Sequence, residues 1–261
     1  MSLLISKTDI LDFKQFTENV PDNRINPYIT ESQEFDLKAA LGYPLFFELM
    51  TYYKRISIVF NTLVGTPYVV GETISGKLSA TVVATGTVIS NASGVLVLDI
   101  VSGSFDTATT LLGGTGAATA NVVSMTYGKY YKLLHGETYT DAQDYSITFK
   151  GIRAALVYWA YARFVENQNM TVTATGLNQK ENEFSKGVDS KMIAARISQA
   201  RSGALAFFED VKKYLCDMNT EDATNFPLWR TGTEDRGISG GSRYTTVNAF
   251  RSNGTSTTKN Y

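Results

Sequence analysis

The spacing of hydrophobic residues changes in the middle of the chain, and this change constrains the fold more than any other feature. From about Gly65 to Thr126, threonine, valine, alanine and glycine dominate, and the charged residues are few: Glu72, Lys77, Asp99 and Asp106. β-Branched residues favour a pleated backbone, and the glycines divide the stretch into short segments. The flanking sequence has helical spacing instead. We therefore predict an inserted all-β domain over 65–126 in an otherwise helical chain.

The predicted β region contains an internal repeat. At an offset of 37 residues, similar residues recur in pairs: Tyr68 with Phe105, Ile74 with Leu111, and Gly76 with Gly113. Such self-similarity indicates two related β units that build one small barrel or sandwich. The clearest strand is 95–101, since it follows the turn-forming residues Asn91-Ala92-Ser93-Gly94.

Helix signals flank the β region on its N-terminal side. Thr8 is placed to cap a short helix through Phe16. Thr30, with Gln33 three residues later, matches a capping box, so a second helix should start there. Gly42-Tyr43-Pro44 should end or kink that helix, and residues 45–53 should resume it.

Two longer helices are predicted on the C-terminal side. Residues 150–166, KGIRAALVYWAYARFVE, are apolar on almost every side apart from Arg153 and Arg163. A helix of this kind is typically buried among neighbours. Between 193 and 218, apolar residues recur at spacings of three and four, which predicts an amphipathic helix.

These signals define four segments. We expect the first part of a helical domain at 1–64, the β domain at 65–126, the second helical part at 127–230, and a flexible C-terminal arm at 231–261. The fold class is therefore predicted as α+β, a helical-bundle adaptor domain with an inserted small all-β domain and an extended arm. The arm is poor in apolar residues but mildly basic, so it is either disordered or orders on a partner. Its candidate partner-binding residues, with the preceding arginine, are Arg230, Arg236, Arg243, Tyr244, Phe250, Arg251 and Tyr261.

Composition excludes several kinds of site. A net charge of −1 gives the chain no overall bias toward nucleic acid or acidic lipid. A single cysteine, Cys216, excludes an internal disulfide, and a single histidine, His135, excludes two-histidine zinc motifs. Asp9 and Asp12 interrupt the start too early for a signal peptide, and the longest apolar run, 154–162, is too short to span a membrane. We expect a cytoplasmic protein without a membrane segment.

The remaining candidate sites have simpler structural explanations. His135, near Asp141 and Asp144, could serve as a metal ligand or a base, but no matched nucleophile or ligand ladder accompanies it, so a solvated loop is expected. Residues 113–118, GGTGAA, lack the lysine of a phosphate-binding loop, which favours a turn between strands. Cys216 falls beside the apolar stripe and should be a small core residue. We predict no catalytic residue, cofactor or metal, and no enzymatic activity.

The helical segments resemble a known family. Residues 28–42, YITESQEFDLKAALG, resemble the first helix of head-to-tail connector (adaptor) proteins of tailed bacteriophages. So do 134–139, LHGETY, ahead of the apolar helix that follows 149. That helix, then TATG at 173–176, a long last helix and FPLW at 226–229 are similar to neck ring proteins of crAss-like phages. The resemblance spans 28–54 and 127–229.

The resemblance implies a virion protein that is located in the neck, and in the host cytoplasm during assembly. It implies a homo-oligomeric ring, usually a dodecamer, beneath the portal. Such a ring extends the DNA channel, with possible non-specific DNA contact, and bridges the portal to other neck and tail proteins. An alternative is another phage structural component, a tail-completion or decoration protein, that binds through the β domain. An enzyme with paired carboxylates is a further alternative, but no carboxylate pair is placed by a motif.

Overall fold

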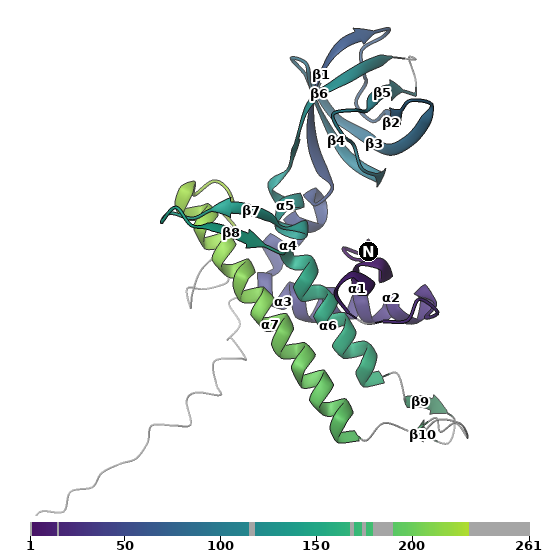
Figure 1. Ribbon diagram of the computed structural model, residues 1–261, viewed down its shortest axis with the longest axis vertical. Helices are drawn as coiled ribbons and strands as arrows, with labels where there is room; N and C mark the ends of the chain where they lie inside the picture. Colours follow the sequence, from purple (N-terminus) through teal and green to yellow (C-terminus); the bar gives the residue numbers. More distant parts are fainter. Residues whose placement is uncertain are drawn as a thin grey trace, which may run out of the picture. The chain divides into compact units, whose positions relative to one another are not determined.

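The computed structural model describes residues 2–14, 16–114, 118–167, 170–173, 176–179 and 190–229 (Figure 1). Contacts join the chain up to Trp229 into one compact unit. The two larger hydrophobic cores lie inside a β-barrel and among the helices, and a smaller cluster joins Tyr161, Ala162 and Ala200. The arm predicted at 231–261, together with its seven candidate residues, lies outside the described residues.

The main sheet is a closed antiparallel barrel of six strands in the order β1-β4-β3-β2-β5-β6. Its strands are β1 Arg55–Val64, β2 Thr73–Leu78, β3 Thr81–Ala92, β4 Val95–Gly103, β5 Thr110–Gly113 and β6 Thr119–Tyr127. Alternate residues point inward, as in β1, where Ile56 and Ile58 are buried and Ser57 between them is partly exposed. Strand β4 confirms the strand predicted at 95–101, and Ser93 and Gly94 form its turn with positive φ angles of 51° and 79°.

The barrel is internally duplicated, which confirms the repeat seen in the sequence. If β1, β2 and β3 are swapped with β4, β5 and β6, each pair of neighbouring strands in the closed order becomes another pair of neighbouring strands. The residues aligned by the repeat also contact each other across the two units. A Cβ on Gly76 would lie 2.9 Å from the ring of Phe105, and a Cβ on Gly113 would lie 3.3 Å from the ring of Tyr68. Each aromatic ring therefore packs on the glycine of the other unit.

The turns before β2 and β5 repeat the same hydrogen bonds. The Glu72 N–H donates to the Val69 carbonyl at 3.0 Å, and the Thr109 N–H donates to the Asp106 carbonyl at 3.0 Å. In return, the Glu72 carboxylate accepts the Val69 N–H, and the Thr109 hydroxyl accepts the Asp106 N–H, both at 3.0 Å. Glu72 and Thr109 are thus buried with their polar atoms engaged.

The helical part comprises the helices and the hairpin of strands β7 Glu137–Thr140 and β8 Ser146–Phe149. Its central helix, α6 Gly151–Asn167, is buried on most sides, as predicted, and lies along α7 Ser190–Glu221 (Figure 1). The other helices are α1 Lys7–Phe13, α2 Asp22–Glu31, η1 Ser32–Leu37, α3 Lys38–Leu41, α4 Tyr43–Tyr52 and α5 Lys129–His135. Strands β9 Met170–Thr173 and β10 Gly176–Gln179 pair with each other. None of the helices in the described ranges has both the length and the apolar character that a bilayer span requires.

Helix starts differ from the predicted caps, whereas one predicted break is confirmed. Helix α1 begins after Ser6, whose N–H donates to the Asp9 carboxylate at 2.6 Å, so Thr8 is not its cap. Thr30 lies inside a helix, where its hydroxyl donates to the Asn26 carbonyl at 3.0 Å. Gly42, with φ of 81°, separates α3 from α4 where the break was predicted.

The predicted fold class, a helical-bundle adaptor domain with an inserted small all-β domain, is wrong. The structure is instead organised around the closed six-stranded barrel, accompanied by helices and ending, among the described residues, in the long helix α7. Strand β1 lies within 1–64, a segment assigned to the helical domain, and a β-hairpin separates α5 from α6. The sequence did not predict β1 because its partners, β4 and β6, become its neighbours only in the tertiary structure.

Candidate functional site

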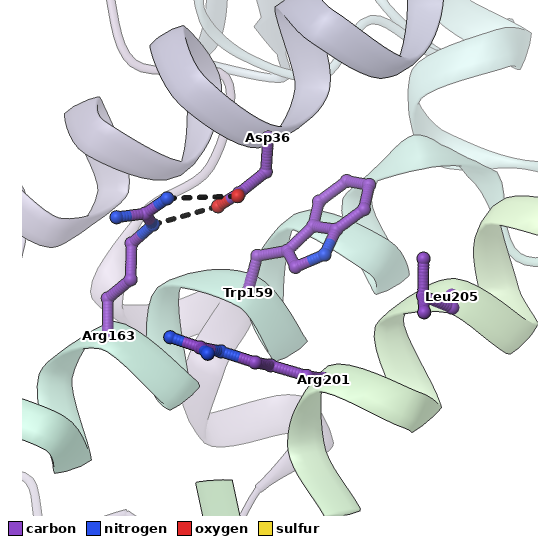
Figure 2. A pocket seen from close by; sticks show the side chains of 5 residues that line it. All are labelled: Asp36, Trp159, Arg163, Arg201 and Leu205. Atoms are coloured by element: carbon purple, nitrogen blue, oxygen red, sulfur yellow. Dashed lines mark hydrogen bonds and ion pairs between the residues drawn. The ribbon is translucent and has the colours of Figure 1, made fainter. Parts of the chain in front are cut away.

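A hollow of about 360 Å³ opens between η1, α6 and α7 (Figure 2). Two pairs of residues four positions apart line it, because such residues share one face of a helix. Trp159 and Arg163 come from α6, and Arg201 and Leu205 come from α7. Asp36 of η1 completes the lining. Trp159 is buried against Phe208, at 5.7 Å between ring centroids, whereas Leu205 is 57% exposed.

Ion pairs fix the two arginines of the hollow. The Arg163 guanidinium donates two hydrogen bonds to the Asp36 carboxylate, at 2.8 and 2.9 Å (Figure 2). It also lies 3.7 Å from the Glu31 carboxylate. The hydrogen bonds to Asp36 raise the pKa of Arg163 above its ordinary value. Arg201 contacts Glu166 through Nη2 at 2.7 Å. A guanidinium has five N–H donors, so the more exposed Arg201 retains donors for a ligand.

Next to Asp36, the π-helix η1 exposes an aromatic side chain. Gln33 is buried, with its Oε1 accepting the Leu4 N–H at 2.7 Å and its Nε2 donating to the Ser2 carbonyl at 3.3 Å. Phe35 of the same element is 64% exposed and lies 5.4 Å from the Arg163 guanidinium. π-Helical turns are frequent at functional sites. Phe35 therefore extends the surface around the hollow with an apolar group.

The barrel exterior forms a second candidate surface. In residues 55–127 the charged side chains are Arg55, Glu72, Lys77, Asp99 and Asp106. Of these, Arg55 and Asp99 pair at 3.0 Å and Glu72 is buried. Many large aliphatic side chains are exposed instead: Val59, Leu63, Val64, Val69, Val70, Leu78, Val82, Val83, Val95, Val101 and Val123. Exposed apolar groups at this density are typical of a surface that another protein covers.

The histidine considered for catalysis does not meet its proposed carboxylates. Asp141 lies in the turn of the β7–β8 hairpin, where its Oδ1 accepts the N–H groups of Gln143 and Tyr145. His135 stacks on Tyr131, with 4.3 Å between ring centroids. Partial burial and the nearby Arg153 cation lower the pKa of His135, while Asp9 opposes this. The lowered pKa favours the neutral form of the imidazole.

The remaining candidates differ in outcome. Cys216, predicted to be a small core residue, is instead a free, partly exposed thiol on α7. Gly113 and Ala118, joined by a 2.8 Å hydrogen bond, flank the connection between paired strands β5 and β6, where a phosphate loop would need a helix. In the described part of the chain, no three His, Cys, Asp or Glu side chains are grouped to hold a metal ion.

Sequence comparison gives one family match. A model described as a family of unknown function, DUF6712, matches residues 110–236. The matched segment contains the hairpin, α6 and α7, and thus all the residues that line the hollow except Asp36. No curated protein matches the chain, and no solved structure matches it.

The hollow was not predicted from the sequence. The sequence pattern places Trp159 and Arg163 on a buried helix and Asp36 on another helix, but it does not predict that they meet. An available signal was Arg163 in the otherwise apolar helix predicted at 150–166, because such a charge requires a partner. The partner of Arg163 lies 127 residues away, so sequence spacing alone does not identify it.

Proposed function

We propose that this chain is a structural virion protein of a tailed bacteriophage that forms a head-to-tail connector ring beneath the portal. It would extend the DNA channel, with possible non-specific contact to DNA, and bridge the portal to neck and tail proteins. In this proposal it acts without catalysis, in the virion neck, after assembly in the host cytoplasm. A dodecamer is the expected oligomer, from the resemblance of its helices to connector proteins.

The observation that carries the proposal is the presence of two separate exposed surfaces. One is the neutral, aliphatic exterior of the barrel, and the other surrounds the hollow with Phe35 and Leu205. A subunit of a closed ring uses different surfaces toward its two neighbours, and a connector needs further surfaces for the portal and the tail. The charged residues around the hollow are paired, which suits a protein interface.

A light-scattering mass measurement of the purified chain, alone and mixed with a portal protein, tests this proposal. We expect a ring-sized particle that binds the portal. A chain that stays monomeric and passes the portal unbound would contradict the proposal.

The second candidate is a tail-completion or decoration protein that binds through the barrel. The aliphatic barrel exterior favours it, since many exposed valines on one part of the molecule suit an interface. Replacing Val82 and Val101 by lysine separates the two functions. A decoration protein would lose its partner, whereas a connector that meets the portal through its helical part would still bind it.

We also propose that the arm at 231–261, outside the described residues, binds the portal or an adjacent subunit. Its arginines suit bidentate pairing with carboxylates. Truncation after Trp229 should give a folded subunit that fails to join the portal, and unchanged portal affinity would rule out this role.

A further inference from the structure

The turn of the β7–β8 hairpin presents an exposed tyrosine. Tyr145 is 68% exposed, immediately before β8. The Asp141 carboxylate accepts the Tyr145 N–H at 2.9 Å, and the Asp141 N–H donates to the Tyr145 carbonyl at 3.0 Å. Asp144, with φ of 63°, is exposed beside it. The backbone of Tyr145 is therefore fixed while its ring and the neighbouring carboxylate face solvent.

The hairpin is held firmly on the helical part. The Tyr139 hydroxyl donates to Asp217 of α7 at 2.8 Å, and Phe149 stacks on Tyr214 with 4.4 Å between ring centroids. Figure 1 shows the turn of the hairpin projecting beyond α7. A preorganised projection of this kind loses little conformational freedom when it docks.

The hollow between η1, α6 and α7 has complementary chemistry. Trp159 and Leu205 supply apolar walls for an aromatic ring, and Phe35 lies next to Arg163 at its edge. Arg201 is 54% exposed and uses Nη2 for Glu166, so its remaining N–H groups suit a carboxylate. Tyrosine, tryptophan and arginine are the residue types that contribute most to binding at protein interfaces.

The Tyr145 turn and the hollow lie at different levels of α7. The hairpin contacts α7 through Tyr139 at Asp217 and through Asp141 of its turn, which lies 3.6 Å from Nζ of Lys213, whereas Leu205 lines the hollow. Lys213 and Leu205 are eight residues apart (213 − 205), which corresponds to about 12 Å along a helix. A turn anchored at Lys213 is therefore held away from the hollow of its own molecule, and that hollow stays open to the turn of another.

We propose that the Tyr145 turn of one copy docks into the hollow of a second copy of this chain. The Tyr145 ring lies between Trp159 and Leu205, and the Asp144 carboxylate pairs with Arg201. Because each copy carries one turn and one hollow, the contact repeats from subunit to subunit and closes into a ring when the rotation permits. The inference deepens the proposed function and rests on it for the closing of the ring.

Two exposed substitutions test the contact in the full chain. Tyr145→Ser removes the docking ring, and Leu205→Arg puts a bulky cation beside Arg201. Val101→Ser, on the exposed barrel surface, is the matched control. Circular dichroism verifies that each variant is folded. By sedimentation, we expect each of the first two variants to associate about tenfold or more weakly than the wild type, and the control to associate normally.

Mixing the two variants gives the decisive result. The intact turn of the Leu205→Arg copy should dock into the intact hollow of the Tyr145→Ser copy, so the mixture should form heterodimers and no larger species. A monomeric wild type, variants that associate like the wild type, or a mixture without heterodimers would overturn the proposal.

Portal binding distinguishes this inference from the proposed function. Variants that bind the portal and still self-associate normally would refute the docking contact alone. Loss of self-association in both variants, with a wild type that never binds the portal, would support the docking contact and refute the connector.

Discussion

The barrel and the helical part are stabilised by different kinds of contact. The barrel core is mostly aliphatic, and its halves interlock through glycine–aromatic contacts, with Tyr68 on Gly113 and Phe105 on Gly76. The helical core is rich in aromatic residues, and directional polar contacts surround it. Tyrosine hydroxyls donate to carboxylates, as in Tyr214 to Glu137 at 2.7 Å, and arginines pair with aspartates. Shape therefore specifies the barrel, whereas shape and charge together specify the helical part.

The same difference extends to the surfaces. The barrel exposes valines with few charges nearby, a composition that recognises a partner mainly by contact area. The helical part exposes Phe35, Leu205 and Tyr145 among paired charges, a composition that also orients a partner. This difference is the reason why the contact proposed between copies lies in the helical part.

The largest expected effect comes from two glycines at the base of the hairpin. Gly136 and Gly151 have positive φ angles of 88° and 76°, and a Cβ on Gly151 would overlap the Leu134 carbonyl oxygen. Gly151→Ala should lower the free energy of unfolding by about 3 kcal/mol, because left-handed strain and backbone overlap add. Urea denaturation, followed by the fluorescence of Trp159 and Trp229, measures the change.

The barrel supplies the control for that substitution. Gly94 has a φ of 79°, but open space surrounds its Cβ position. Gly94→Ala should cost only the conformational strain, about 1 kcal/mol. Equal losses of unfolding free energy for Gly94→Ala and Gly151→Ala would show that the close approach of the Leu134 carbonyl adds nothing to the loss at Gly151.

The next effect concerns the partly buried ion pair of the helical part, between Arg163 and Asp36. Arg163→Met leaves the Asp36 carboxylate, 25% exposed, without its bidentate partner. We expect a loss of about 2 kcal/mol in unfolding free energy. Lys212→Met, which removes a more exposed pair with Glu209, should cost less than about 0.5 kcal/mol. Adding Asp36→Asn to Arg163→Met should recover part of the loss, and a double variant without recovery would argue against an unpaired-charge penalty.

A smaller effect tests the duplication of the barrel. A Cβ on Gly76 would lie too close to Phe105, and one on Gly113 would lie 2.7 Å from the Glu72 carboxylate and close to Tyr68. Gly76→Ala and Gly113→Ala should each cost about 1 to 2 kcal/mol by overpacking. In double-mutant cycles, Phe105→Leu should reduce the destabilisation caused by Gly76→Ala and leave that caused by Gly113→Ala unchanged. A reduction of both would mean that the two glycine–aromatic pairs are not packed independently.

The smallest expected effect is the dependence of folding stability on pH that arises from His135. Its pKa is lowered in the folded state from the ordinary value of 6.5, so the unfolded chain binds the proton more readily. Stability should therefore rise with pH between the folded pKa and 6.5, and fall as pH drops through this window. NMR titration of the ring measures the folded pKa. His135→Ala should remove the slope and leave assembly close to normal, whereas a folded pKa above 6.5 or a loss of assembly would contradict this account.

Local patterns predicted much of the secondary structure but placed some boundaries incorrectly. The apolar run at 150–166 and the stripe at 193–218 predicted α6 and most of α7, because burial of one face follows from helical spacing. Strand β1 was missed, since RISIVFNTLV continues the apolar sequence of α4 without a glycine or proline to separate them. The capping box at Thr30 was wrong because the chain is already helical from Asp22.

The sequence by itself determined the β character of residues 65–126, their internal duplication, the break at Gly42 and the two long helices. Each of these depends on neighbouring residues or on a fixed repeat, which are visible along the chain. Only the tertiary structure decided the closure of the barrel, the pairing of Asp36 with Arg163, and the hollow that faces Leu205. These features join residues far apart in sequence, and their free energy arises from burial and desolvation when the elements pack. That is why spacing along the chain does not reveal them.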